Sequence, residues 1–221
     1  MPGAVTVGMR LMTRRLLPAL LILPLLGCPE PPKPPTGQVR AETSIPVPAF
    51  TLTERHGQSV TNTDLEGKVW VASFVFTRCT GPCPQVTATM TRLQEELTLT
   101  AEPNLRLVTF TVDPERDTPT ELLDYAKKFR ADDKQWLFLT GPEATIHQLL
   151  KDGFKVTAQR SPTPTPGDEF DHSSRLAVVD KAGHIRGYFD GFRADQSHDP
   201  AGEFAANLNA LKGLVRELLA E

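Results

Sequence analysis

The sequence has almost no excess of charge of either sign, and this excludes one class of partner. Its 221 residues include 24 Lys and Arg and 27 Asp and Glu, a formal net charge of −3. Residues 1–27 contain three of the arginines and no acid, so the rest of the chain carries 21 basic and 27 acidic residues, or −6. A mildly acidic surface of mixed charge does not attract a polyanion. We therefore expect no nucleic-acid partner.

The sequence also lacks a long hydrophobic run near its start. The apolar stretch from Leu16 to Leu26 has 11 residues, whereas a spanning helix needs about 20. It follows three arginines and ends at Gly27-Cys28, which is typical of a signal peptide and resembles the bacterial lipobox. We expect residues 1–27 to be a lipoprotein-type signal peptide and Cys28 to carry the lipid. An ordinary signal peptide or an uncleaved anchor is the alternative.

Cysteine is scarce, because the chain has only three. With Cys28 assigned to lipid, Cys79 and Cys83 remain as a pair. Their four-residue spacing closes almost no loop, so a disulfide between them would stabilise the fold little. A plain structural disulfide remains the alternative, but a chemical role is favoured. Two thiolates one helical turn apart can form a redox disulfide or hold a soft metal ion.

The composition divides the chain into three parts. Residues 28–47 are rich in proline, which makes a chain extended and semi-rigid, and we expect them to form a tether. Residues 48–221 have a usual single-domain length and no internal repeat. We expect an exported protein of the bacterial cell envelope, anchored to a membrane through lipid with its domain outside the cytoplasm.

Hydrophobic periodicity predicts a strand followed by a helix around the cysteine pair. The apolar run from Val69 to Phe76 is typical of a strand buried on both faces. From Pro84 to Thr98 the apolar side chains fall on one face of a helix. Cys79 and Cys83 then lie on the turn between the two elements. Cys83 is at the positive end of the helix dipole, which favours its thiolate.

The remaining patterns predict an α/β sandwich with a mixed central β-sheet flanked by α-helices. With the cysteines after an early central strand, this order looks like the thioredoxin fold. Strands are expected at residues 50–52, 59–60, 69–76, 105–112, 136–139, 176–179 and 185–189, and helices at 84–98, 119–130, 142–151 and 204–218.

Asp113 and Asp117 flank the next strand-to-helix turn, and both have a structural interpretation. Asp113-Pro114 can form a turn, and Asp117 favours a helix N-terminus. The same turn is expected at the carboxyl end of a strand next to the cysteine strand, where α/β sites collect. We therefore also count both aspartates as supporting site residues.

Three stretches in register resemble the Sco/SenC family of copper-binding, thioredoxin-like proteins. They are the Cys79-to-Pro84 segment, the run from Asp113 to Pro119, and Asp171-His172-Ser173. The resemblance implies copper ligands at Cys79, Cys83 and His172. It also implies a role in assembling the copper centre of cytochrome c oxidase, as a copper carrier or as a thiol:disulfide reductant of that centre.

The chemistry of these residue types agrees with copper. Thiolates select Cu(I), and an imidazole also suits Cu(II). Met90 is the only methionine after residue 27, so a methionine-rich site is excluded, and structural zinc usually takes four protein ligands. The other four histidines are expected to be surface residues; they are His56, His147, His184 and His198.

The stretch before His172 is unusual in composition. Ser161 to Gly167 has alternating prolines and no apolar residue. It is expected to be a loop, either a plain surface excursion or a mobile arm that lets His172 close on a metal.

We predict a membrane-tethered copper-binding assembly factor that delivers copper to, or matures, the copper centre of a respiratory oxidase. Its expected partners are the oxidase subunit or another copper protein, and a thiol reductant. One alternative is a thiol:disulfide reductase in which Cys79 or Cys83 attacks a partner disulfide. Another is a peroxide-reducing enzyme of the peroxiredoxin type, for which Thr77 would have to serve the reactive cysteine.

Overall fold

The computed structural model describes residues 1, 3–4, 39–193 and 202–221 of the chain. Cys28, His198 and almost all of the predicted signal peptide lie outside the described residues. Within the described part, no helix combines the length and the apolar character that crossing a membrane requires.

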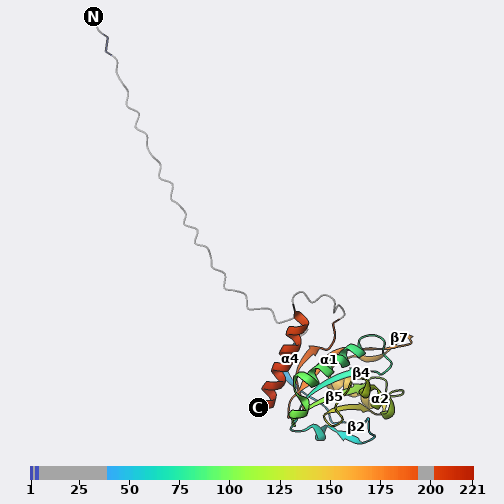
Figure 1. Cartoon of the computed structure of the whole chain (residues 1–221). Helices are drawn as coiled ribbons and strands as arrows, with labels where there is room; N and C mark the ends of the chain where they lie inside the picture. The colour runs from blue at the N-terminus through green and yellow to red at the C-terminus, as the bar shows by residue number, and fades with distance from the viewer. Residues whose placement is uncertain (2, 5–38, 194–201) are drawn as a thin grey trace. The chain divides into compact units, whose positions relative to one another are not determined.

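The described strands form one mixed eight-stranded sheet and one separate hairpin, and the predicted α/β sandwich is confirmed (Figure 1). The sheet order is β1-β10-β9-β4-β5-β6-β2-β3, and the hairpin is β7-β8. The strands are β1 Val39–Pro46, β2 Thr51–Glu54, β3 Ser59–Thr61, β4 Val69–Val75, β5 Leu105–Thr111, β6 Trp136–Thr140, β7 Ala158–Thr165, β8 Asp168–His172, β9 Arg175–Val179 and β10 His184–Asp190.

The parallel centre of the sheet sets the position of the site. β4 runs parallel to β5 in an unbroken register from Val69↔Leu105 to Val75↔Thr111, and β5 runs parallel to β6. The neighbours on both sides, β9 and β2, are antiparallel. The carboxyl ends of β4 and β5 therefore lie side by side, as predicted, and the segments that follow them meet at that edge.

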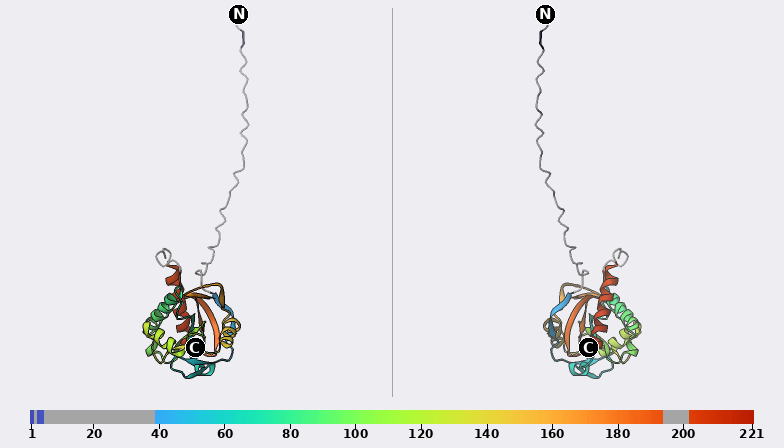
Figure 2. Two further views of the ribbon diagram at one scale, coloured as in Figure 1. Left: turned by 90° about the vertical axis from the view of Figure 1, so that its right-hand side faces the viewer. Right: turned by 90° about the vertical axis from the view of Figure 1, so that its left-hand side faces the viewer.

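Helices cover both faces of the sheet. Right-handed connections between parallel strands place α1 and α2 on one face, and a Lys212–Glu96 ion pair joins α4 to α1 there. Figure 2 shows α4 and α1 together on the same side of the sheet. The helical elements are α1 Cys83–Glu96, α2 Pro119–Lys128, α3 Glu143–Gln148, α4 Glu203–Ala220, the short helices η1 Asn62–Leu65 and η2 Leu99–Ala101, and the π-helical turn η3 Leu149–Gly153.

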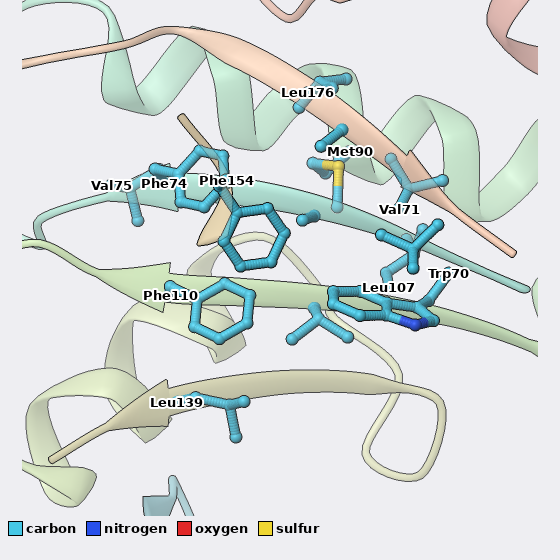
Figure 3. Close-up of a cluster of buried hydrophobic side chains, with 14 of the residues drawn as sticks. Trp70, Val71, Phe74, Val75, Met90, Leu107, Phe110, Leu139, Phe154 and Leu176 are labelled. Atoms are coloured by element: carbon cyan, nitrogen blue, oxygen red, sulfur yellow. The ribbon is translucent and has the colours of Figure 1, made fainter. Parts of the chain in front are cut away.

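Aromatic side chains fill the face of the sheet opposite to α1 (Figure 3). The Phe154 ring, just after η3, packs on Phe74, Phe110 and Trp70 at centroid distances of 5.0, 5.2 and 5.9 Å. All four side chains are at most 1% exposed. Burying one such side chain contributes about 1.5–3 kcal/mol to the free energy of folding, so this packing stabilises the central strands that carry the site.

Two segments differ from the sequence-based expectation. Within the range 28–47, expected to be a tether, residues 39–46 form β1, which pairs with β10 at the edge of the sheet. The expected loop from Ser161 to Gly167 belongs mostly to β7, so the segment is a hairpin rather than a loop. Proline is tolerated in β7 because this strand pairs on one side only and can spare ladder donors.

Candidate metal and thiol site

Both cysteines lie where β4 passes into α1, as predicted. Cys79 is on the turn, where its N–H donates to the Phe76 carbonyl at 3.2 Å. Cys83 is the first residue of α1. The Thr87 hydroxyl donates to the Cys83 carbonyl at 2.9 Å and lies 2.8 Å from the Tyr125 hydroxyl of α2. These buried hydrogen bonds fix the start of helix α1, which carries the sulfur of Cys83.

Asp117 holds the first half of the same turn. Its carboxylate accepts the Thr77 N–H at 3.0 Å, the Thr77 hydroxyl at 2.6 Å and the Thr111 hydroxyl at 2.5 Å. Thr77 begins the cysteine turn and Thr111 ends β5, so one carboxylate joins the ends of two strands. Burial raises the pKa of Asp117, against these three hydrogen bonds.

Asp113 has a different environment from Asp117. Its side chain is only 1% exposed, and among the described residues neither carboxylate oxygen accepts a hydrogen bond. The nearest cation is Arg116, whose Nη1 lies 3.8 Å from one carboxylate oxygen. Burial therefore raises the pKa of Asp113 as well. The contacts place Asp117, and not Asp113, directly on the cysteine turn.

His172 reaches the sulfurs from the β7-β8 hairpin, of which it is the last residue. Its Nε2 lies 3.1 Å from the Cys83 Sγ, and its Nδ1 lies 3.2 Å from the Ser173 carbonyl. The imidazole packs edge-on against the Phe76 ring, at 5.6 Å between ring centroids. Phe170 of the hairpin also packs on the Phe76 ring, again at 5.6 Å between centroids. The aromatic contacts therefore direct the ring toward the cysteine turn.

The structure brings the three predicted ligands together. One ligand atom each from Cys79, Cys83 and His172 lies within 4.8 Å of the others, and both cysteines are free thiols. Among the described residues, these three form a cluster of possible metal ligands that combines two thiols with one imidazole. Two sulfurs and one nitrogen are a donor set that suits copper, so the residues present fit the expected ion.

The two thiols differ in acidity, and the order is not the one expected from the helix dipole. A hydrogen bond from the Cys83 thiol lowers the pKa of Cys79 to about 4. Burial raises the pKa of Cys83, and negative charge on Cys79 raises it further. Cys83 is fully buried and Cys79 is 8% exposed. Burial thus outweighs the dipole at Cys83, and Cys79 is the more acidic of the two thiols.

Other predicted residues are placed as follows. The Thr77 hydroxyl donates to Asp117 and not to a cysteine, which removes the feature on which the peroxiredoxin alternative depended.

The other described histidines differ in burial. His56 is exposed and His184 is half-buried. His147 is also half-buried rather than a plain surface residue, because its Nε2 lies 3.0 Å from the Val112 carbonyl and its ring faces Phe170 at 6.1 Å.

An ion-pair cluster beside the site has no counterpart in the sequence-based prediction. Glu169 of β8 pairs with Arg78, next to Cys79, at 2.6 Å and with Arg116 at 3.2 Å. The dipeptide Pro166-Gly167 was the available signal, because Pro-Gly marks a turn. A turn there would have predicted the hairpin, but not which charges it brings together.

Comparison with known proteins gives one consistent result. The family description SCO1/SenC matches residues 39–203. The chain is 32% identical to the "SCO1 protein homolog" of Bacillus subtilis over 155 residues, which is 70% of this chain and 78% of that protein.

Solved structures agree with this match. BsSco, described as "a member of the Sco family of cytochrome c oxidase assembly proteins" with a disulfide switch, has a TM-score of 0.65 at 27% identity, over 82% of this chain and 98% of that one. ScoI of Bradyrhizobium japonicum, solved with copper bound, has a TM-score of 0.58 at 26% identity, over 75% and 98%.

Proposed function

We propose, from the premise that this chain belongs to the SCO1/SenC family, that it binds copper through Cys79, Cys83 and His172. The observation that carries the proposal is the convergence of two sulfurs and one imidazole nitrogen within 4.8 Å. The thiolates would hold Cu(I), and the imidazole would add the donor that Cu(II) favours. The bound ion is a cargo, and the role proposed for the chain is to carry or present it.

The proposed recipient is the copper centre of a respiratory oxidase or another copper protein. The relationship to BsSco, described as a cytochrome c oxidase assembly protein, supports an oxidase. Cys79 is the less buried of the two cysteines, at 8% exposure, and this supports it as the ligand nearer to a partner protein during transfer. Phe76 packs edge-on against the His172 ring, and Phe170 packs on Phe76.

A second candidate function is reduction of a disulfide in a partner protein, and the two neighbouring free thiols of Cys79 and Cys83 favour it. The Cys79 thiolate would attack a partner sulfur and form a mixed disulfide, and the partner's other sulfur would leave as a thiolate and take up a proton. The Cys83 thiol would then lose its proton and attack the Cys79 sulfur, which closes a Cys79–Cys83 disulfide, and the partner's remaining sulfur would leave as a thiolate and take up a proton. Two electrons pass from the cysteine pair to the partner, which is released as a dithiol.

One experiment on the full-length chain tests both functions. We expect reduced protein to bind one Cu(I) per chain and protein oxidised at Cys79 and Cys83 to bind none, because both states use the same sulfurs. Copper is measured after removal of free metal, and reduction of the oxidised sample should restore binding. Equal copper in both samples would place the ion elsewhere. Absence of copper from both, with a mixed disulfide trapped in Cys83→Ser, would favour the reductase.

The location of the protein is a separate proposal, based on the sequence. We propose a lipid anchor at Cys28 that holds the domain outside the cytoplasm in the bacterial cell envelope. Cys28→Ser should move the protein from the membrane fraction to the soluble fraction while its copper content stays unchanged, as measured by fractionation and metal analysis. A Cys28→Ser protein that stays in the membrane fraction with residues 1–27 still attached would indicate an uncleaved anchor instead.

A further inference from the structure

The hairpin that carries His172 is not part of the main sheet. β7 and β8 pair with each other, and Ser173 N–H donates to the Thr157 carbonyl at the base of the hairpin at 3.0 Å. The tip of the hairpin crosses to the cysteine turn, where the Thr80 N–H donates to the Gly167 carbonyl at 3.0 Å. Thr80 directly follows Cys79, so the hairpin tip is hydrogen-bonded to the residue next to one sulfur ligand.

Glu169 links the hairpin tip to both loops at the carboxyl edge of the sheet. One carboxylate oxygen accepts from Arg78 at 2.6 Å and from Arg116 at 3.2 Å, and the other accepts the Gly167 N–H at 3.0 Å. Arg78 belongs to the cysteine turn and Arg116 to the loop after β5. Glu169 is mostly buried, whereas the two arginines are about half exposed.

Resting on the proposed copper function, we propose that Glu169 is a positioning residue that clasps the hairpin onto the cysteine turn. Glu169 precedes His172 by three residues on the same strand, so the contacts that fix Glu169 also restrict where His172 can lie. The clasp holds the His172 Nε2 at 3.1 Å from the Cys83 Sγ. It thereby determines whether the third donor is available, which matters more for Cu(II) than for Cu(I).

The test compares two Glu→Gln variants of the full-length chain. Glu169→Gln removes the charge that pairs with Arg78 and Arg116. The matched control is Glu115→Gln, which removes a 2.7 Å ion pair to Arg160 on the same hairpin but not on the cysteine turn. For Glu169→Gln we expect Cu(II) affinity to fall about tenfold, the lower end for residues that support a ligand. We expect a smaller loss for Cu(I), a changed Cu(II) electron paramagnetic resonance spectrum, and no change in either property for Glu115→Gln.

A second readout does not require metal and keeps the inference separate from the proposed function. In the copper-free reduced protein, amide hydrogen exchange at Thr80 reports release of the hairpin tip. We expect about tenfold faster exchange in Glu169→Gln, because charged hydrogen bonds are lost, and unchanged exchange in Glu115→Gln. Failure of the wild-type protein to bind copper would refute the proposed function but leave this readout intact.

Three results would overturn the clasp. The first is unchanged Thr80 exchange in Glu169→Gln. The second is an equal change in both variants, which would indicate general loosening of the hairpin. The third is an equal loss of Cu(I) and Cu(II) affinity with faster exchange across the whole sheet, which would indicate unfolding.

Discussion

The two halves of the site are held by different kinds of contact. The sulfur half is attached to the parallel strands by buried hydrogen bonds, in which Asp117 accepts from Thr77 and Thr111. The histidine half lies on a separate hairpin, joined to the cysteine turn by the buried Phe76–Phe170 contact, by ion pairs of half-exposed arginines and by the hairpin-tip hydrogen bond. Water and salt weaken exposed ion pairs but not buried hydrogen bonds. The sulfurs are therefore fixed by buried contacts, whereas the imidazole depends in addition on ion pairs at the surface.

The largest expected effect comes from removing one ligand from each half. Cys83→Ser should lower Cu(I) affinity by at least about a hundredfold, more than residues behind a ligand usually contribute. His172→Ala should lower Cu(I) affinity less and Cu(II) affinity more, because two thiolates alone can hold Cu(I). Competition with a chromophoric chelator measures both, with His56→Ala, on an exposed turn, as the control. Equal Cu(I) losses in the two variants would contradict the division.

A smaller effect is expected at the base of the sulfur half. Asp117→Asn should reduce the free energy of unfolding by about 1–3 kcal/mol, since it leaves buried donors without a full acceptor. Asp64→Asn is the control, because the Asp64 carboxylate also accepts an N–H and a hydroxyl, both from Thr61, but is exposed. Urea titration measures the free energy of unfolding of both variants. Equal losses would mean that burial does not increase the contribution of the carboxylate hydrogen bonds to stability.

The pH dependence of these two variants should have opposite signs. Burial raises the pKa of Asp117 above 3.8, so the native state binds more protons than the unfolded state there. The stability advantage of the wild type over Asp117→Asn should therefore shrink as pH rises through that raised pKa. Hydrogen bonds from Thr61 lower the pKa of Asp64 below 3.8, so its contribution should be lost as pH falls below 3.8. The measurement is the same urea titration at several pH values.

The smallest expected effect separates the hairpin contact from backbone strain. Gly57 and Gly167 both have positive φ, 80° and 88°, so alanine at either should cost about 1 kcal/mol. An added Cβ at Gly57 meets open space, whereas one at Gly167 would lie 2.5 Å from two atoms of the Thr80 side chain. Gly167→Ala should therefore lose more stability by thermal unfolding and also weaken Cu(II) binding. Identical behaviour of the two variants would mean that the tip contact is unimportant.

The sequence predicted the sulfur half better than the histidine half, and the reason is physical. A strand buried on both faces and a one-faced helix leave strong local patterns, so β4, α1 and the two cysteines were placed correctly. His172 was identified through the family resemblance, but the hairpin that positions it was expected to be a loop. Its strand contains alternating prolines, and its contacts with Arg78, Thr80 and Arg116 are distant in sequence. Neither feature follows from local periodicity.

The same limit applies to the acidic residues and to β1. Asp113 and Asp117 looked alike in sequence, and only the fold shows that Asp117 faces Thr77 while Asp113 has no hydrogen-bond donor among the described residues. The acidity of the thiols depends on the burial of Cys83, which outweighs its place in the helix. Residues 39–46 were expected to belong to a tether because the range 28–47 is rich in proline. Their strand partner β10 lies near the other end of the chain, so the pairing leaves no local pattern.

The position of Arg78 has a consequence for any protein that approaches Cys79. Arg78 is half exposed, directly precedes Cys79 in the sequence, and is one of the two arginines that pair with Glu169. A carboxylate of a docking protein that paired with Arg78 would compete with Glu169 for it. Docking and hairpin closure would then be linked equilibria: the partner would loosen the hairpin by the same factor by which a closed hairpin weakens the partner's binding. The guanidinium of Arg78 would then serve both in the recognition of a partner and in holding His172 near the sulfurs.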